Sequence, residues 1–261
     1  MCLRFFNLEK CRGYLMKKCL KWMEMAACVS LALGMLGCEA FEAEEARDEL
    51  IDAIIWGKNV TNWDTSQITD MSDLFEISML FNQDIGNWDV SNVIDMASMF
   101  SFAGEFNQNI GNWDVSNVID MSSMFYMAVS FDQDLSSWNV SNVMDMSSMF
   151  YMAESFDQDL SSWNVSNVMD MSSMFYMAVS FDQDLSSWDV SNVRDMMSMF
   201  YMAESFDQDL SSWNVSNVED ADRMFLFSGL SRKNYCKMIT TNDGWKRLSE
   251  EFDLGVDYTC D

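Results

Sequence analysis

The residues of this sequence that could do chemistry are carboxylates, and they recur at an interval of 25 residues. One series is Asp134, Asp159, Asp184 and Asp209, and another is Asp145, Asp170, Asp195 and Asp220. Paired carboxylates could serve a glycosidase, but that reaction needs two acids in different environments, whereas repeats offer acids in equivalent ones. The sequence also has no His, the commonest acid–base group near neutral pH. We therefore expect no enzyme, no catalytic residue and no cofactor.

Stacked repeats would align these acids in columns. Two like charges about 5 Å apart repel by roughly 1 kcal/mol in water and by several times more at lower dielectric. The columns must therefore face solvent, accept backbone N–H groups at turns, or hold cations. Solvated turns are the simpler interpretation, and weak Ca²⁺ binding along a column is the alternative. Because the sequence has neither an EF-hand loop nor a Gly-Gly-x-Gly-x-Asp repeat, we predict no metal site.

The elements that position the acids are repeats of 25 residues. The tryptophans keep this spacing without a slip: Trp63, Trp88, Trp113, Trp138, Trp163, Trp188 and Trp213. Residues 126–150 and 151–175 differ at one position, where Val129 becomes Glu154. A strict period of 20–50 residues predicts a solenoid, in which each repeat buries its apolar side against its neighbours. We expect the seven tryptophans to form the repeat core.

The sequence pattern of each repeat predicts one short parallel strand and one short helix. In the coil 126–150, Val143, Met146 and Met149 are three residues apart, as on one face of a helical turn. Asp-Leu-Ser around Leu135 alternates as a short strand does. The fold class is therefore an α/β repeat solenoid of seven coils over residues 59–225, which we expect helices to cap at both ends.

The composition excludes anionic partners. Net charge is −27, and residues 59–225 hold 27 Asp and Glu against Arg194 and Arg223, which leaves −25 on the repeats. Such a surface repels nucleic acid and anionic lipid, whose binding rests on Lys and Arg. The chain has 26 Met. Because they follow the apolar period, we interpret them as core filling beside aromatic rings rather than as a soft metal site.

The first 40 residues resemble an export leader. A basic stretch over 1–24 precedes an apolar stretch over 25–38, which is short for a spanning helix. Cleavage after Ala40 would fit a signal peptide. Met35-Leu-Gly-Cys38 resembles a bacterial lipobox, so lipidation of Cys38 is an alternative. An uncleaved anchor, a misassigned start codon and a buried helix of the fold are further alternatives.

The segments that flank the repeats are interpreted as caps. Residues 41–58 predict an amphipathic N-terminal helix, with Leu50, Ile51, Ile54 and Ile55 on one face. Residues 226–261 form the C-terminal cap, with a short amphipathic helix through Trp245, Leu248 and Phe252. Removal of the leader would leave only Cys236 and Cys260, an even pair that an oxidising compartment favours as a disulfide. Two free buried thiols are the alternative.

The repeat sequence resembles a known family. Phe81-Asn-Gln-Asp-Ile-Gly-Asn-Trp-Asp-Val-Ser-Asn-Val-Ile-Asp-Met96 is similar to the BspA family of leucine-rich-repeat surface proteins. More narrowly, it resembles the branch first noted as a Mycoplasma surface-protein domain of unknown function. The resemblance covers about residues 60–230. It implies a leucine-rich-repeat-like solenoid, export and, in some members, adhesion to host or matrix proteins. It brings no catalytic residues.

These observations favour a secreted or cell-surface binding or adhesion module that is not catalytic. Its partner would be an extracellular protein or glycan, with membrane contact only through the leader or a lipid anchor. The alternative is a structural envelope spacer, whose surface should be uniformly polar. Tyr126, Tyr151, Tyr176 and Tyr201 form one candidate column on a binding face, and half-buried packing is the other interpretation. Candidate N-glycosylation sites, relevant in a eukaryotic source, are Asn59, Asn139, Asn164 and Asn214.

Export is directly testable. We expect mass spectrometry of the mature protein from its native host to find a first residue near Phe41, or a lipidated Cys38. A soluble cytosolic form that retains residues 1–38 would contradict the prediction.

Overall fold

The computed structural model describes residues 35–260, and side chains from residue 43 onward. It contains three described helices: α2 (Met35–Ile55), α3 (Arg232–Thr241) and α4 (Asp243–Glu251). The chain divides into two compact units, Met1–Glu42 and Ala43–Asp261. Of the first unit, only the start of α2 lies within the described residues, so most of the expected leader and the Cys38 side chain lie outside them. The second unit contains all the repeats.

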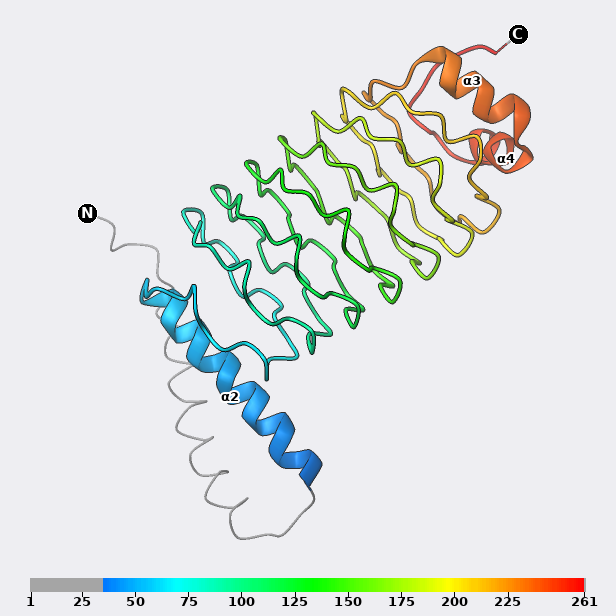
Figure 1. The fold of residues 1–261 in the computed structure, drawn as a ribbon. Coiled ribbons are helices and arrows are strands. Elements are labelled where there is room, and N and C mark those ends of the chain that lie inside the picture. Colours follow the sequence, from blue (N-terminus) through cyan, green and yellow to red (C-terminus); the bar gives the residue numbers. More distant parts are fainter. Residues whose placement is uncertain (1–34, 261) are drawn as a thin grey trace, which may run out of the picture. The chain divides into compact units, whose positions relative to one another are not determined.

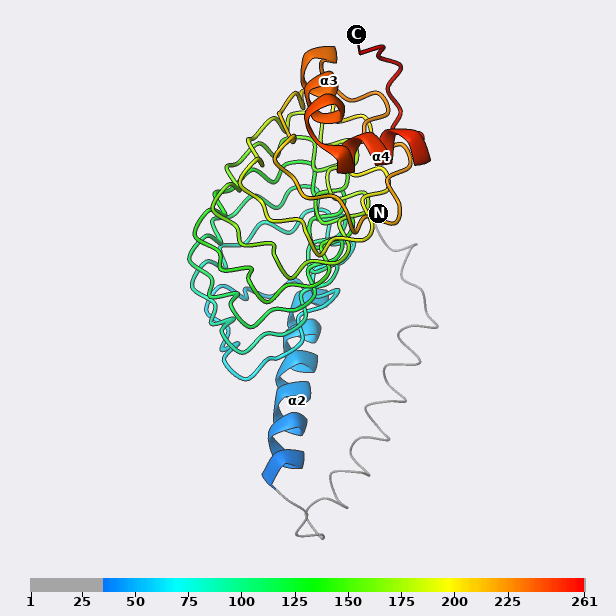
Figure 2. The same ribbon diagram turned by 90° about the vertical axis from the view of Figure 1, so that its right-hand side faces the viewer.

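The repeats form coils that lie one over the next between α2 and α3 (Figure 1), and seen from the side the coils follow similar paths (Figure 2). Backbone hydrogen bonds join each coil to its neighbour. In one such row, the N–H groups of Met146, Ser148 and Phe150 donate to carbonyls 24 residues later, over 2.8–3.0 Å. The aspartates of the Asp145 column form isolated parallel bridges, one residue in each coil. A coil therefore leaves backbone groups for the next coil to satisfy.

The expected strand and helix within each coil are not present. In residues 59–225 of the structure, the chain runs through turns, and the inter-coil bridges fall at Asp145 and its equivalents rather than near Leu135. The reason lies in the backbone. Two residues per coil, such as Ser148 (φ 55°) and Met152 (φ 54°), adopt the left-handed region. A left-handed residue interrupts both α-helix and strand, and it costs an L-residue about 1–2 kcal/mol, which the inter-coil hydrogen bonds offset.

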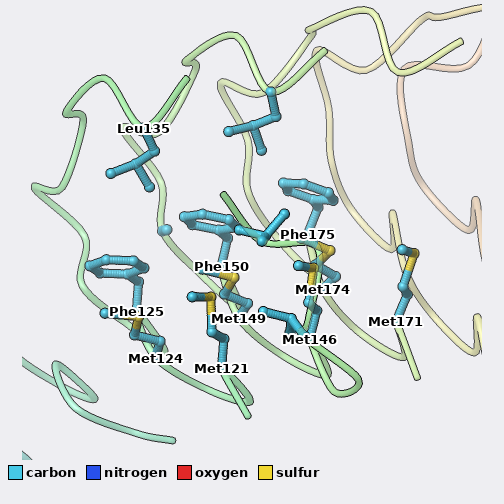
Figure 3. Close-up of a cluster of buried hydrophobic side chains, with 14 of the residues drawn as sticks. Met121, Met124, Phe125, Leu135, Met146, Met149, Phe150, Met171, Met174 and Phe175 are labelled. Carbon is cyan, nitrogen blue, oxygen red and sulfur yellow. The ribbon is translucent and has the colours of Figure 1, made fainter. Parts of the chain in front are cut away.

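Aromatic and methionine side chains fill the interior of the coils. Phe125, Phe150 and Phe175 stack with ring centroids 5.5–5.6 Å apart, and Met124, Met149 and Met174 lie beside them (Figure 3). The five tryptophans from Trp113 to Trp213 are at most 4% exposed. Their rings stack on one another, as those of Trp138 and Trp163 do with centroids 6.4 Å apart. Each of these indoles also donates Nε1–H to a carbonyl of the preceding coil, as Trp163 does to Leu135 at 2.9 Å. Trp88 is buried in the same way, and Trp63 is half-buried at the first coil.

Helix α2 terminates the N-terminal end of the coils. It begins six residues before the expected start of the capping helix and ends at Ile55. Leu50 and Ala53 are fully buried in the core. The Arg47 guanidinium donates to the carbonyls of Asp70 (2.9 Å) and Ser72 (2.6 Å). In later coils the equivalent carbonyls accept N–H groups from the preceding coil, so one arginine replaces those donors.

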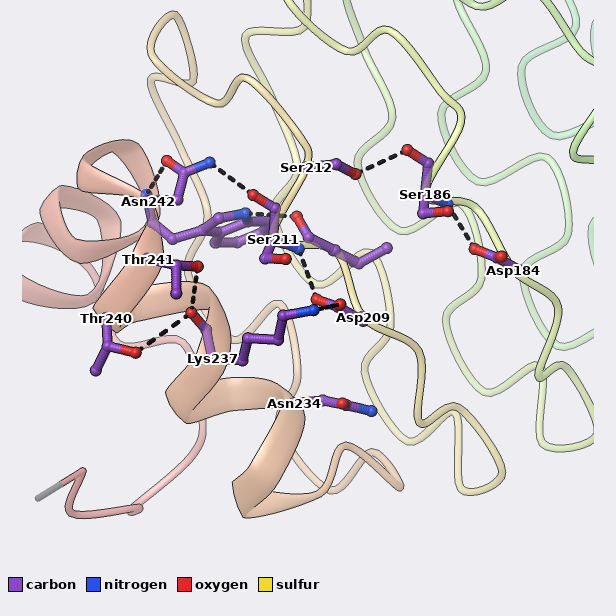
Figure 4. A network of polar contacts seen from close by, with 12 residues as sticks. Asp184, Ser186, Asp209, Ser211, Ser212, Asn234, Lys237, Thr240, Thr241 and Asn242 are labelled. Atoms are coloured by element: carbon purple, nitrogen blue, oxygen red, sulfur yellow. Dashed lines mark hydrogen bonds and ion pairs between the residues drawn. The ribbon is translucent and has the colours of Figure 1, made fainter.

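The C-terminal cap consists of two helices rather than the single helix expected. Trp245 of α4 is fully buried, its ring stacks 6.3 Å from that of Trp213, and its Nε1–H donates to the Leu210 carbonyl at 2.9 Å. Its position is 32 residues beyond Trp213, so the cap adds an eighth indole out of register. Asn242, between α3 and α4, donates to the carbonyls of Ser211 and Trp213 (2.9 Å each), beside the ion pair of Lys237 with Asp209 (Figure 4).

The segment after α4 completes the cap. The N–H of Phe225 donates to the Leu254 carbonyl at 2.9 Å, in the manner of one coil bonding to the next. Cys236 of α3 and Cys260 form a disulfide with Cα atoms 5.3 Å apart. The disulfide joins this terminal segment to α3.

The tryptophan column predicts where the stack is most sensitive. We expect Trp163→Ala to lower the free energy of unfolding by about 3–5 kcal/mol, because it removes a buried ring from between two coils. Urea melts that resolve more than one transition would show that the stack divides at this coil.

The matched control is Ser161→Ala, two residues away and exposed, which should change stability by no more than about 0.5 kcal/mol. Trp163→Phe should fall between the two, because it keeps a ring but removes one of the two donors to the Leu135 carbonyl, which still accepts the Trp138 N–H at 3.0 Å. Equal, small effects of Trp163→Ala and Ser161→Ala would contradict the burial of the column.

Candidate binding face

The hydrogen-bonded row described above also makes a surface, which we call the ladder face. It consists of one nine-residue segment from each coil: 69–77, 94–102, 119–127, 144–152, 169–177, 194–202 and 219–227. Because alternate N–H groups in each segment bond to the next coil, the segments lie side by side with their positions aligned. Equivalent side chains therefore form columns across the face.

A stack of tyrosines is the most regular column of the ladder face. The rings of Tyr126, Tyr151, Tyr176 and Tyr201 are 4.4–4.5 Å apart and within 10° of parallel. All four are half-buried. Burial and the neighbouring tyrosines raise the pKa of Tyr151 to about 12, so its hydroxyl is protonated at neutral pH. The two inner rings have both faces covered by neighbouring rings and present their edges and hydroxyls.

Apolar side chains form two further columns on the ladder face. Next in sequence to the tyrosines is a half-buried column of Met127, Met152, Met177 and Met202. In the outer coils the same position holds Ile77, Phe102 and Phe227, which are 37–65% exposed. At the start of the segments a second column is 40–48% exposed: Ile94, Ile119, Met144 and Met169. The core does not require these side chains, because separate Met, Phe and Val columns fill it. They leave an apolar surface in contact with solvent.

Between these apolar columns runs the column of Asp70, Asp95, Asp120, Asp145, Asp170, Asp195 and Asp220. Each carboxylate accepts the N–H of the residue two positions later, as Asp145 does from Ser147 at 2.8 Å. In three coils the usual serine at that later position is replaced, by Ala97, Met197 and Asp222. Burial raises the pKa of Asp95 and of Asp195, assisted by the neighbouring aspartates.

The second aspartate series lies outside the ladder face, and the pKa values of Asp134, Asp159 and Asp209 are lowered there. Asp134 and Asp159 accept hydrogen bonds from Ser136 and Ser161, which lower the pKa of both carboxyls. These acids therefore serve solvated turns. Among the residues that the structure describes, no three acidic or cysteine side chains gather as a metal ion would require. The geometry gives no support to a Ca²⁺ site along either column.

The structure separates the other residues singled out from the sequence. The tryptophans lie in the interior. The sequon residues Asn59, Asn139, Asn164 and Asn214 are exposed and lie outside the segments of the ladder face. Asn139 and its equivalents accept the N–H of the serine two positions later. The Met127 column was missed, although an apolar residue follows the tyrosine position in every coil. Arg47 carried no sequence signal, because its role depends on the end of the stack.

Comparison with known proteins identifies the class of the chain. It is a repeat protein, and a family model matches it twice, over residues 48–160 and 133–237. The chain belongs to the family described as Mycoplasma protein of unknown function, DUF285. No curated protein and no solved structure matches the chain significantly. Within residues 35–260, no helix combines the length and the hydropathy that a membrane span requires.

Asp195 and Asp159 should respond to substitution with opposite signs. Asp195 has a raised pKa, so its charged form destabilises the folded state at neutral pH, and this cost disappears as the pH falls through the raised value. We expect Asp195→Asn to stabilise the protein at pH 7. Asp159 has a lowered pKa, so its charged form stabilises the fold above the unfolded pKa of about 3.9. We expect Asp159→Asn to destabilise it.

Because water screens both carboxylates, each change should stay within about 1 kcal/mol. Urea melts at neutral pH and at a pH below both pKa values measure the effects, which should shrink at the acidic pH. Asparagine is tolerated at the position of Asp159, since Asn109 is the equivalent residue of an earlier coil. A destabilising Asp195→Asn at neutral pH would contradict the assigned cost of that charge.

Proposed function

We propose that the chain is a secreted or cell-surface protein of the BspA-like, leucine-rich-repeat type that acts as a non-catalytic binding or adhesion module through its ladder face. The observation that carries the proposal is the set of exposed apolar columns on that face. Four residues of one column, Ile94, Ile119, Met144 and Met169, are 40–48% exposed although the core is complete without them. Contiguous exposed apolar surface is typical of interaction sites.

The apolar columns favour binding over the spacer alternative. A spacer without a ligand has no use for aligned Tyr, Met and Ile side chains at its surface, and such columns would be replaced by polar residues without loss of the core. The tyrosines also favour a protein partner over a glycan. Sugars stack on the faces of aromatic rings, but neighbouring rings cover both faces of Tyr151 and Tyr176.

The carboxylates support a non-catalytic role. The aspartates of the Asp145 column share one backbone contact, the N–H two residues later, and Asp134 and Asp159, whose pKa values are lowered, lie outside that face. Catalysis by two carboxylates needs environments that separate their pKa values. The disulfide between Cys236 and Cys260 supports an oxidising compartment. Signal-peptide cleavage and lipidation of Cys38 remain the two routes to the surface that we propose.

Binding is tested by capture of extracellular proteins with the full-length chain and with the double variant Tyr151→Ser/Tyr176→Ser. Serine is the natural residue at this position in the second coil, Ser101. We expect the wild-type chain to retain a partner that the double variant loses by about tenfold or more in affinity, as removal of central aromatic anchors does.

The control is the exposed substitution Ser161→Ala, outside the ladder face, which should leave capture unchanged. Thermal melts of all three proteins establish that the double variant stays folded. Equal capture by the wild type and the double variant would mean that the binding site lies outside the ladder face. Binding to a glycan array without capture of any protein would overturn the proposal that the partner is a protein.

A further inference from the structure

Carboxylates flank the tyrosine stack on both sides. Towards the start of each segment lies the Asp120, Asp145, Asp170 and Asp195 column. Three residues after the tyrosine, Glu154 and Glu204 are exposed and alternate with Val129 and Val179 at the equivalent position. The apolar stripe of Tyr151, Met152 and their equivalents therefore lies between the aspartate column on one side and the glutamates Glu154 and Glu204 on the other.

No cation compensates these acids in the central coils. The sequence has no Lys or Arg from residue 59 to residue 193. Arg194 forms an ion pair with Glu219 at 3.0 Å. Burial is the main cause of the raised pKa of Asp195, and the neighbouring charges of Asp170 and Asp220 add to it. A partner that brings cations would relieve this repulsion and cover the apolar stripe in the same step.

From the apolar stripe and its two acidic borders, we propose that the occupant of the ladder face is a cationic polypeptide segment, in which apolar side chains cover the Tyr–Met stripe and Lys or Arg side chains pair with Asp145, Glu154 and their equivalents. This inference rests on the proposed function and names the chemistry of the partner. Charge complementarity of this kind steers association and sets which partners are accepted.

The same charges exclude other occupants. A second copy of the chain would set the acidic borders of one face against those of the other, and each copy has a net charge of −27. Nucleic acid, sulfated glycan and anionic lipid are repelled for the same reason. A neutral glycan lacks the cations and cannot reach the covered ring faces of the inner tyrosines.

The probe is a synthetic peptide of alternating Leu and Lys, whose binding to the full-length chain is measured by fluorescence anisotropy. Two peptides of equal length serve as comparisons, one of alternating Leu and Glu and one of alternating Ser and Lys. We expect the Leu–Lys peptide to bind about tenfold or more tightly than the Ser–Lys peptide, and the Leu–Glu peptide not to bind. The affinity of the Leu–Lys peptide should fall as the ionic strength rises from about 0.01 M to about 1 M, because the Debye length shrinks over this range from about 30 Å to about 3 Å.

Two variants with the same change of net charge locate the site. Glu154→Gln/Glu204→Gln removes two carboxylates at the border of the stripe. Asp159→Asn/Asp184→Asn removes two exposed carboxylates outside the ladder face, at a position where Asn109 occurs naturally. We expect the first pair to weaken Leu–Lys binding about threefold or more relative to the second. Tyr151→Ser/Tyr176→Ser should weaken it further.

Equal effects of the two charge variants would mean that the peptide responds to net charge alone, which overturns the assignment to the face. A Leu–Lys peptide that does not bind would overturn the cationic partner. If the wild-type chain still captured an extracellular protein that the Tyr151→Ser/Tyr176→Ser variant loses, the proposed binding function would stand, and only the cationic nature of the partner would be overturned. Failure of both experiments would overturn both proposals.

Discussion

The structure depends on the hydrogen bonds that each coil's backbone makes to the next coil. A coil such as 126–150 has no helix or strand of its own to satisfy its N–H and carbonyl groups, so it is complete only between two neighbours. Unsatisfied backbone groups at either end would be costly. The ends imitate the missing coil: Arg47 supplies donors at one end, and Ser231, Asn234 and Leu254 supply coil-like partners at the other. The caps are thus chemical substitutes for a repeat.

The same constraint produces the ladder face. Left-handed residues such as Ser148 and Met152 let alternate N–H groups point along the stack while the intervening ones close turns within the coil. This backbone sends Met146, Met149 and Phe150 inward and leaves Met144, Tyr151 and Met152 at the surface. The core and the face are therefore two sides of one segment.

The period of 25 made the repeats, their bounds and the inward position of the tryptophans predictable from the sequence. The internal structure of a coil was not predictable in the same way. Val143, Met146 and Met149 have helical spacing, but serine and methionine give no sign of a left-handed φ, which glycine or asparagine would have suggested. Trp245 was unpredictable as a ladder member because it is out of register. The tyrosine column was visible in the sequence, whereas its stacking and covered ring faces required the structure.

Near-identity of the central coils has a kinetic consequence for any ligand of the ladder face. A bound segment meets almost the same side chains after a shift by two coils, because Glu154 and Glu204 alternate with Val129 and Val179, so docking registers two coils apart are nearly equal in free energy. This degeneracy adds a statistical factor to affinity without any new contact. It also allows a bound segment to translate along the stack two coils at a time, as proteins slide along the uniform backbone of DNA, instead of dissociating completely to change position.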